Sequence, residues 1–250
     1  MTESGDGREV VVKRGHAPGA TAAEVAGLRW LAAAGTVPVP AVRSHDRDQL
    51  VIDRVPAGRP SAAAAERFGR GLAGLHAAGA PAFGAPPPDG PADAWIGRAP
   101  MANVPAADWA SWYAADRVLP YVRLAVDAGT FGPSEATVFE RACARIPASA
   151  EPPARLHGDL WNGNVLWDGR EAWLIDPAAH GGHRETDLAM LHLFGCPHLD
   201  RIVGGYQERS PLAEGWRDRI GLHQLFPLLV HTVLFGRSYA DQALAAARTF

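Results

Sequence analysis

The sequence predicts an α+β protein with two lobes, a small N-lobe rich in β-strand and a larger, mainly helical C-lobe that carries one β-hairpin. Short β-rich runs at residues 8–14 and 49–53 enclose one helical segment near the N-terminus. Beyond a connector at residues 54–60 that contains proline and glycine, most segments have helical periodicity. We place the lobe boundary at about residue 55, with residues 56–250 as the C-lobe.

The first N-lobe elements follow from local patterns. The run REVVVKR at residues 8–14 predicts a strand after a Gly-Asp-Gly turn signal, so Lys13 is expected near the end of that strand. Apolar residues at helical spacing predict a helix over residues 21–34, which Thr21 would cap and Gly35 would end. The N-lobe is therefore expected to hold a helix between two strands.

Glu24 lies on the apolar side of this predicted helix, four residues before Leu28. A carboxylate in that position needs a cation or a local hydrogen-bond partner. Lys13 is the single lysine of the chain, which otherwise uses arginine for positive charge. Two interpretations remain open: Glu24 pairs with Lys13, or it forms a capping box with Thr21.

The C-lobe is expected to be mainly helical. Ser61 opens a helix that extends to about residue 78. Residues 79–107 contain three consecutive prolines and predict an irregular surface segment. Further helices are predicted at residues 108–128, 133–146, 220–238 and 241–249.

Composition excludes several classes of function. The 250 residues are 47% hydrophobic and carry a net charge of −3, with charges scattered along the chain, so no basic surface for nucleic acid is expected. The most apolar stretch, residues 225–235, contains Pro227 and His231 and is 11 residues long, against roughly 20 for a membrane span. The partners are expected to be small molecules.

The termini and cysteines indicate the cellular compartment. The N-terminus lacks the charged start and apolar core of a secretory signal, so we expect a cytoplasmic protein. Cys143 and Cys196 lie far apart without the spacing of a metal site, and are expected to be small core residues.

The segment RLHGDLWNGNVLWDGREAWLIDP, residues 155–177, holds the predicted catalytic residues. Its two apolar runs and the turn between them are residues 165–167, Asp168-Gly169 and residues 173–175. If Trp167 faces Trp173 in this hairpin, Asn164 faces Asp176, because opposite residues of antiparallel strands lie roughly 4.5 to 5.5 Å apart. An amide oxygen and a carboxylate that converge in this way predict a Mg²⁺ site.

Asp159 lies five residues before Asn164 in a glycine-containing loop, where it can face the metal without binding it. It is the predicted proton acceptor. Phosphoryl transfer requires such a base, a metal held by two other groups and a cation on the nucleotide phosphates. Lys13 can supply that cation, with Glu24 orienting its ammonium group. The combination indicates a kinase.

Two alternatives remain open from the residues alone. Asp159 and Asn164 also suit ordinary turns. A metal-dependent hydrolase would instead use histidines with Asp159 and Asp176 as ligands of a transition metal. The histidines in question are His157, His180, His183, His192 and His198. Their spacing is irregular and leaves Lys13 and Glu24 unexplained.

With these motifs in place, the sequence resembles the fructosamine (ketosamine) kinase family, which is related to aminoglycoside phosphotransferases and choline kinases within the protein-kinase-like fold. The resemblance covers nearly the whole chain. It is carried by VVKRG, EVAGLRWL, LVIDRVPAGRPS, FGRGLAGLHA, HGDLWNGN and IDPAAHGGHRETDLAM. HGDLWNGN together with GHRETDLAM is specific for fructosamine kinases, whereas HGD and the asparagine alone fit any related phosphotransferase.

The resemblance implies ATP and Mg²⁺ as cofactors and gives roles to individual residues. It implies that Asp159 is the base and that Asn164 and Asp176 are the Mg²⁺ ligands. It also implies that Lys13, oriented by Glu24, contacts the ATP phosphates. The implied adenine site is the backbone around Asp53, Arg54 and Val55.

The implied substrate is a ketosamine, a sugar joined to an amine by glycation, phosphorylated on its sugar 3-hydroxyl group. Such a reaction would serve deglycation of proteins or metabolites. Trp161, His183 and Arg184 are the candidates for substrate binding. Asp187 and His157 are expected to support the catalytic loop from behind.

The sequence departs from the family in two places. The family has a helix, two strands and a phosphate-covering loop ahead of the lysine strand, whereas 12 residues precede Lys13, so we expect a truncated N-lobe without that loop. Residues 178–182, AAHGG, lack the aromatic residues often found before GHRE. The short N-terminus has three explanations: a true start upstream of Met1, weak ATP binding, or a relative without catalysis. A kinase of another acceptor, such as an aminoglycoside or a choline-like alcohol, and an ATP-binding pseudokinase therefore remain as alternatives.

Overall fold

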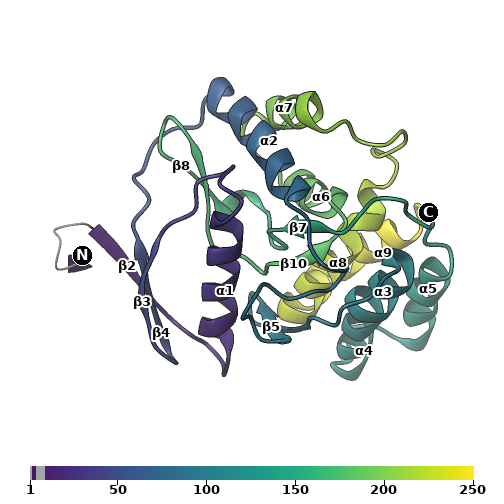
Figure 1. Cartoon of the computed structure of the whole chain (residues 1–250). Coiled ribbons are helices and arrows are strands. Elements are labelled where there is room, and N and C mark those ends of the chain that lie inside the picture. Colours follow the sequence, from purple (N-terminus) through teal and green to yellow (C-terminus); the bar gives the residue numbers. More distant parts are fainter. Residues whose placement is uncertain (1, 4–8) are drawn as a thin grey trace.

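The computed structural model describes the backbone of residues 2–3 and all of residues 9–250. An antiparallel sheet in the order β1-β2-β4-β3 lies at one end of the described molecule, with helix α1 between it and the rest (Figure 1). The elements of this part are β1 (Thr2–Glu3), β2 (Glu9–Arg14), α1 (Ala20–Ala32), β3 (Val42–His45) and β4 (Gln49–Asp53).

A small apolar core fixes α1 on this sheet. Val25 and Leu28 of α1 pack against Leu50 and Ile52 of β4, and all four side chains are buried. The alternation of buried and partly exposed residues along β4 is that of a strand with one covered face. Lys13 lies opposite Leu50 in the ladder between β2 and β4, so the sheet holds the lysine beside α1.

The C-lobe is mainly helical and contains three short strand pairs among its described residues. Its helices are α2 (Ala62–Ala77), α3 (Trp109–Trp112), a π-helical turn (Tyr113–Val118), α4 (Leu119–Asp127), α5 (Pro133–Cys143), α6 (Glu185–Leu193), α7 (Leu199–Arg209), α8 (Ile220–Phe235) and α9 (Arg237–Ala247), with a 3₁₀ turn at Asn162–Asn164. Its strands are β5 (Asp93–Ile96), β6 (Ala99–Ala102), β7 (Ala154–Leu156), β8 (Val165–Trp167), β9 (Ala172–Leu174) and β10 (His180–Gly182).

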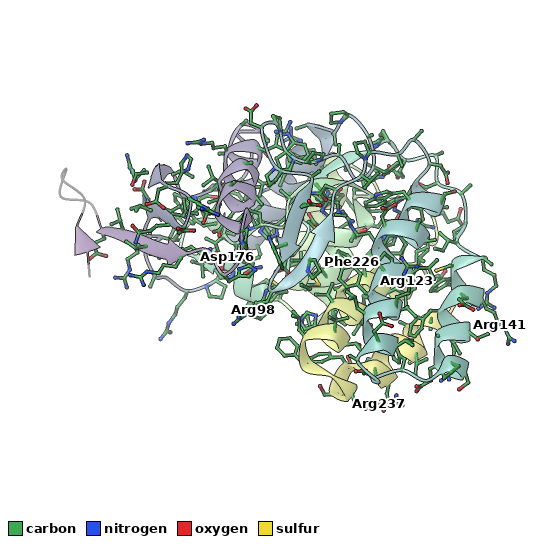
Figure 2. The ribbon with its side chains drawn as sticks, turned by 90° about the horizontal axis from the view of Figure 1, so that it is seen from below. Arg98, Arg123, Arg141, Asp176, Phe226 and Arg237 are labelled. Atoms are coloured by element: carbon green, nitrogen blue, oxygen red, sulfur yellow. The ribbon has the colours of Figure 1, made fainter. Side chains whose placement is uncertain are left out.

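Two apolar cores hold the C-lobe together. The larger one, which includes Trp109, Tyr121 and Phe226, lies among α3, α4, α5, α8 and α9. Figure 2 shows Phe226 inside this group of helices, whereas Arg141 and Arg237 lie at its outer edge. The second core lies under α2, α6 and α7 and reaches the hairpin β8–β9. The hairpin is therefore supported by packed helices.

Most of the predicted elements are confirmed, with shifted ends. The side chain of Ser61 caps α2, because its Oγ accepts a hydrogen bond from Ala64 N at 3.2 Å. The predicted helix over residues 108–128 is present as α3, the π-helical turn and α4. The last two helices are separated at Gly236, whose φ of 73° ends α8, and not near residue 240 as predicted.

The predicted helix cap at Thr21 is wrong. Helix α1 begins at Ala20 after Gly19, which has a left-handed backbone (φ 78°) and no side chain to donate or accept. Thr21 lies inside the first turn, and its buried hydroxyl has no hydrogen-bond partner among the described residues. Glu24 therefore does not serve a capping box.

The predicted irregular surface segment at residues 79–107 is wrong as well. It contains the hairpin β5–β6, in which Trp95 faces Pro100, and a bridge between Phe83 and Ala106. Phe83 and Ile96 of this segment are buried in the larger core. Of the prolines in this segment, Pro100 alone lies within a strand of the hairpin, so the prolines do not prevent pairing.

The remaining expectations concern the N-terminal residues, a membrane-spanning helix and the two cysteines. The two residues of β1 pair with β2 ahead of the lysine strand. The Gly-Asp-Gly turn signal and residue 8 of the first predicted strand lie outside the described residues.

Among the described residues, no helix is both long and apolar enough to cross a membrane. Cys143 and Cys196 are free and half-buried against the cores.

The contact between α2 and α7 gives a test of the packing. Gly205 of α7 lies so close to α2 that an added Cβ would be 2.3 Å from Glu66 O, whereas its neighbour Gly204 has open space. Gly205→Ala is therefore expected to lower the free energy of unfolding by about 1–3 kcal/mol through overpacking. Gly204→Ala is expected to raise it by about 0.5–1 kcal/mol, because alanine favours an exposed helix position.

Chemical denaturation of the two variants and the wild type measures both values. Equal effects of the same sign at Gly204 and Gly205 would contradict the close approach of α2 and α7.

Candidate active site

A cavity of about 360 Å³, here called the interlobe cavity, opens between the N-terminal elements and the C-lobe. Its lining includes the five residues for which the sequence predicts phosphate, metal or proton chemistry: Lys13, Glu24, Asp159, Asn164 and Asp176. Figure 2 shows Asp176 where the N-terminal elements meet the rest of the chain. The fold therefore brings β2, α1, the 155–164 loop and the hairpin to one place.

Lys13 connects β2 to both α1 and the hairpin. Its Nζ donates to Glu24 Oε1 and, at 2.6 Å, to Asp176 Oδ1. Burial alone would lower the pKa of Lys13, but the two carboxylates raise it above its ordinary value. A full positive charge is therefore held in the interlobe cavity at neutral pH. Of the two interpretations of Glu24, the structure shows the ion pair.

The register of the hairpin β8–β9 differs from the prediction by one residue. Trp167 faces Ala172, and Asn164 lies opposite Ile175, whose N–H donates to the Asn164 carbonyl oxygen at 3.1 Å. The predicted direct facing of Asn164 and Asp176 is therefore wrong. The reason is the turn, where Asp168 Oδ1 accepts from the N–H groups of residues 170 and 171, both at 2.7 Å, and closes a loop shorter than the predicted one.

Asp176 reaches the interlobe cavity through a special backbone conformation. Its φ is 53°, in the left-handed region that residues other than glycine rarely adopt. A one-residue change of register would turn a regularly extended residue to the other face of the hairpin. The left-handed residue interrupts that alternation, and Asp176 lines the same cavity as Asn164.

The orientation of the Asn164 amide follows from its contacts. Its Nδ2 donates to the Asp159 carbonyl oxygen at 2.8 Å and to Asp159 Oδ2 at 3.1 Å. Because only the nitrogen of an amide can donate to these oxygens, the side-chain oxygen points away from them. Asn164 thus offers an oxygen ligand in the cavity that Asp176 also lines.

Asp159 has the electrostatic environment of a weakly acidic carboxyl group. Burial raises its pKa, and the neighbouring charges of Asp176 and Asp187 raise it further against the hydrogen bond from Asn164, to about 7. A carboxylate with such a pKa is well matched to proton transfer near neutral pH.

Asp187, at the start of α6, holds the loop that carries Asp159. Its Oδ2 accepts from His157 N at 2.8 Å and lies 3.2 Å from His76 Nε2, while its Oδ1 accepts from Gly158 N at 3.0 Å. Burial opposes its ionisation, but these hydrogen bonds and the two histidines keep the pKa of Asp187 below its ordinary value. Gly158 has a left-handed backbone (φ 83°), as the sharp approach of its loop requires.

His157 links the same loop to the end of β9. It is fully buried, its Nδ1 accepts from Asp159 N at 3.2 Å, and its Nε2 lies 2.8 Å from Ile175 O. The ring therefore carries its proton on Nε2 and is neutral, in line with the burial that lowers its pKa. His157 thus connects the backbone of Asp159 to that of Ile175, the residue before Asp176.

The three candidates for substrate binding do not come together. Trp161 lines the interlobe cavity with a ring that is partly exposed. His183 and Arg184 do not line that cavity. Arg184 donates to Glu151 at 2.7 Å, and His183 lines a separate cavity of about 310 Å³. The structure thus keeps Trp161 at the candidate site and places the other two elsewhere.

Asp53 is the last residue of β4, and Arg54 and Val55 follow it. All three lie outside the lining of the interlobe cavity. Arg43 holds the carboxylate of Asp53 by two hydrogen bonds, at 2.5 and 2.6 Å. The N–H of Arg54 donates to Glu9 O at 3.0 Å. Their part in adenine binding stays a prediction.

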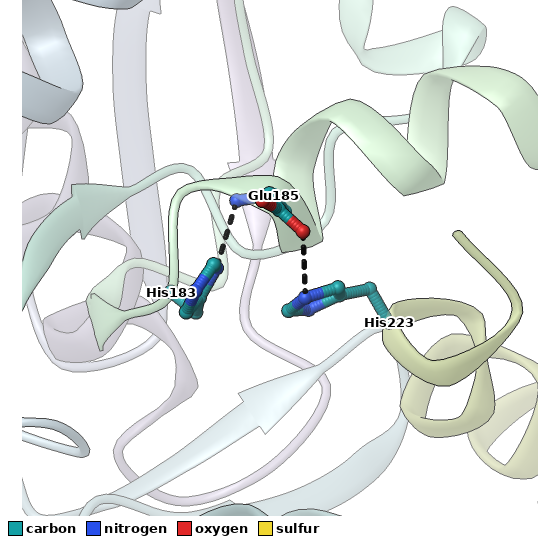
Figure 3. Close-up of side chains that lie close together, drawn as sticks. All are labelled: His183, Glu185 and His223. Atoms are coloured by element: carbon teal, nitrogen blue, oxygen red, sulfur yellow. Dashed lines mark hydrogen bonds and ion pairs between the residues drawn. The ribbon is translucent and has the colours of Figure 1, made fainter. Parts of the chain in front are cut away.

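The histidine alternative does not match the structure. Three of its five predicted ligands bond to main-chain carbonyl oxygens: His157 to Ile175, His180 to Ala178 and His192 to Leu188. Within the part of the chain that the structure describes, the one group of three potential metal ligands is His183, Glu185 and His223, within 4.8 Å of one another (Figure 3). Neither Asp159 nor Asp176 belongs to it.

In this group of His183, Glu185 and His223, the guanidinium group of Arg219 already neutralises the carboxylate of Glu185. Arg219 donates to both oxygens of Glu185, at 2.8 and 2.6 Å, and the Glu185 N–H donates to His183 Nδ1. Trp109 packs on both histidine rings. A cation placed there would meet the guanidinium group, so the cluster is best explained as a buried ion-pair network.

Several residues that line the interlobe cavity were missed from the sequence. They include His16, Trp95, Met101 and Asn103. Three of them belong to the segment predicted to be irregular. The signal that was available is the Gly97-Arg98 pair between two short runs, since Gly97 has a φ of 55° and suits a two-residue hairpin turn.

Comparison with known proteins agrees with this geometry. The model of the fructosamine kinase family matches residues 5–249. The chain belongs to the fructosamine kinase family. A protein from Thermobifida fusca whose solved structure is named for a fructosamine-3-kinase is 48% identical, with a TM-score of 0.91 over 99% of this chain and 87% of that one.

Relatives of this fructosamine kinase family member are named as probable ketoamine kinases. One from Synechocystis is 36% identical over 229 residues, 88% of this chain and 75% of the relative. One from Enterococcus faecium is 36% identical over 176 residues, 68% of this chain, which spans 61% of that relative's length. The aminoglycoside phosphotransferase of a gentamicin complex, 11% identical with a TM-score of 0.64 over 96% of this chain and 84% of that one, shares the fold alone.

The raised pKa of Asp159 predicts a pH-dependent stability. The folded protein keeps the carboxyl group protonated up to about pH 7, whereas the unfolded chain releases this proton near pH 4, so the group's contribution to stability is lost as pH rises through that window. Asp159→Asn cannot ionise. Its free energy of unfolding, relative to the wild type, is expected to rise by on the order of 2 kcal/mol between pH 4 and pH 7.

Denaturation at a series of pH values, without divalent cations, measures this difference. Asp200→Asn, on the exposed first turn of α7, is the matched control and should follow the wild type. Parallel curves for Asp159→Asn and the wild type would show that Asp159 ionises normally.

Proposed function

We propose that this protein is an ATP-dependent kinase that phosphorylates a sugar hydroxyl group of a ketosamine, a reaction of the fructosamine 3-kinase type. One observation carries the proposal: Lys13, Glu24, Asp159, Asn164 and Asp176 line a single cavity in a member of the fructosamine kinase family. The names of the ketoamine kinase relatives support the acceptor class. Deglycation of proteins or metabolites, in the cytoplasm, is the corresponding role.

ATP is proposed to bind with its phosphates at Lys13 and its adenine at the backbone of Asp53, Arg54 and Val55. The ammonium group of Lys13 is held in place by Glu24, so little conformational freedom is lost when it contacts a phosphate. The same ammonium group forms an ion pair with Asp176.

The oxygen donors of the interlobe cavity fit a magnesium ion. The carboxylate of Asp176 and the side-chain oxygen of Asn164 are hard ligands of the kind that Mg²⁺ prefers, and no thiol is among the described residues that line the cavity. When bound, the ion would neutralise charge on the phosphates. Asp176 and Asn164 would hold the ion, and Lys13 would contact the nucleotide phosphates.

Asp159 is proposed to accept the proton of the reacting hydroxyl group. The hydrogen bond from Asn164 orients its carboxylate, and the contacts of His157 and Asp187 with N–H groups of the loop hold its backbone. A general base contributes about 10²–10⁴-fold to a rate. Trp161 and Trp95 would form apolar walls for the carbon atoms of the acceptor.

The first prediction of the proposed function is the activity itself. With Mg²⁺ and ATP, the wild type should consume ATP when fructosyl-amines or ribulosyl-amines are added, and not with aminoglycosides or choline. Asp159→Ala should lower kcat about 10²–10⁴-fold with little change in ATP affinity, because the base does not bind the nucleotide. Coupled ATP turnover and phosphate analysis of the product measure both.

The outcomes of this experiment separate the alternatives. Turnover with an aminoglycoside or a choline-like alcohol alone would replace the ketosamine as acceptor. ATP binding without any turnover would indicate a pseudokinase. An unchanged kcat in Asp159→Ala would remove that residue from catalysis.

Lys13→Arg gives a second prediction. Arginine keeps the charge, but its planar guanidinium group cannot occupy the narrow place between Glu24 and Asp176, so ATP turnover should fall by roughly 10²-fold. Arg47→Lys, on the exposed turn between β3 and β4, reverses the exchange and should have no effect.

Because Lys13 is the only lysine, ¹⁵N-lysine labelling gives a single side-chain Nζ resonance that reports nucleotide binding directly. This resonance should shift when MgATP is added. Full activity of Lys13→Arg, or a resonance that does not respond to MgATP, would return Lys13 to a structural role.

A further inference from the structure

Asn103, directly after β6, lies in the wall of the interlobe cavity and is missing from the set of residues predicted for catalysis. Its side chain is 1% exposed. The Nδ2 group of this side chain has no hydrogen-bond partner among the described residues. A buried amide that lacks a partner on one side of a ligand cavity indicates that the ligand supplies the partner.

Arg117, in the π-helical turn, determines which way this amide points. Its Nη2 donates to Asn103 Oδ1 at 2.9 Å and its Nη1 to Ala102 O at 2.7 Å. A guanidinium group has donors only, so the amide atom that faces it must be the oxygen. The NH₂ group of Asn103 is thereby fixed on the opposite side and cannot rotate to find another partner.

The guanidinium group of Arg117 is itself held firmly. It is 1% exposed and lies over the rings of Trp112 and Phe226, at 4.6 and 5.4 Å from their centroids. Burial lowers the pKa of Arg117 to about 10, which leaves it protonated at neutral pH. Asn103 therefore faces a permanent cation, and its backbone is fixed too, since its N–H donates to Ala92 O at 2.7 Å.

The position of Asn103 favours the acceptor over the nucleotide as its partner. The groups proposed for ATP come from the N-terminal sheet, at Lys13 and residues 53–55. Asn103 comes from the C-lobe segment that also supplies Trp95 and Met101 to the cavity wall. In this part of the cavity wall the Nδ2 donor of Asn103 lies among apolar side chains, and a few polar groups in an apolar wall are the usual composition of a site that fixes a small polar ligand.

We propose that Asn103 is a specificity-determining residue, whose Nδ2 donates to an oxygen of the ketosamine sugar, with Arg117 as the residue that positions it. The inference rests on the proposed function. A ketosamine that lacks this oxygen leaves the buried amide unpaired and is rejected, which is how buried polar groups discriminate between substrates. The pair of Asn103 and Arg117 thus selects a hydroxylated acceptor.

The test uses Asn103→Asp, in which the donor becomes an acceptor while the contact with Arg117 is kept. The expected result is a fall in kcat/KM for the ketosamine of about 10²-fold, with the KM for ATP unchanged. Val104→Asp places the same charge on the next residue, whose side chain is exposed, and should behave as the wild type.

A series of ketosamines, each lacking one hydroxyl group, identifies the partner oxygen. With the wild type, one member of the series should have a kcat/KM about 10²-fold below that of the complete ketosamine. With Asn103→Asp, the same member and the complete ketosamine should have similar kcat/KM values, because both changes remove the same hydrogen bond. The inference is overturned if the effects of the missing hydroxyl group and of Asn103→Asp on kcat/KM are additive for every member of the series. It is also overturned if Asn103→Asp has the kcat/KM of the wild type.

Binding without turnover separates this inference from the proposed function. The side-chain NH₂ signals of Asn103, assigned from their absence in the ¹⁵N spectrum of Asn103→Asp, should shift when a fructosyl-amine is added. A shift without phosphorylation supports the contact and contradicts the kinase activity. Phosphorylation without a shift supports the activity and contradicts the contact.

Discussion

The buried carboxylate of Asp187 is the interaction on which the candidate site depends. A charge that is 1% exposed is stable only when it is fully hydrogen-bonded, and Asp187 meets this need with the N–H groups of His157 and Gly158 and with His76. The partners come from α2 and from the loop before β8, so one side chain joins a helix to the catalytic loop. Asp159 is placed by the same contact, one residue further along.

A second ionic contact closes the site from the N-terminal side. Lys13 bonds to Glu24 of α1 and to Asp176 of the hairpin, so the sheet, its helix and the C-lobe meet at one ammonium group. The connector helps, because Gly58 donates to Trp167 O at 2.7 Å and has no room for a side chain beside Asp168. The candidate site is thus formed by one buried charge network, around Asp187, and one partly exposed network, around Lys13, and packed apolar cores support both.

Much of this arrangement could be predicted because it is local. The spacing between Asp159 and Asn164, the hairpin and the apolar stripes follow from neighbouring residues. The register failed because the carboxylate of Asp168 closes a shorter turn, and no periodicity reports such a contact. Asn103 was missed because its importance comes from Arg117, fourteen positions away, and not from its neighbours in the sequence.

The sequence by itself determined the family, the order of the elements and the residue types that phosphoryl transfer needs, since these depend on composition and short-range spacing. Tertiary structure alone decided that Glu24 pairs with Lys13 and not with a helix cap, that Asp176 turns into the cavity through a left-handed backbone, and that His183 lies in another network. The physical reason is that burial and long-range contacts set the orientation and charge of a side chain, and these exist only when distant segments pack together.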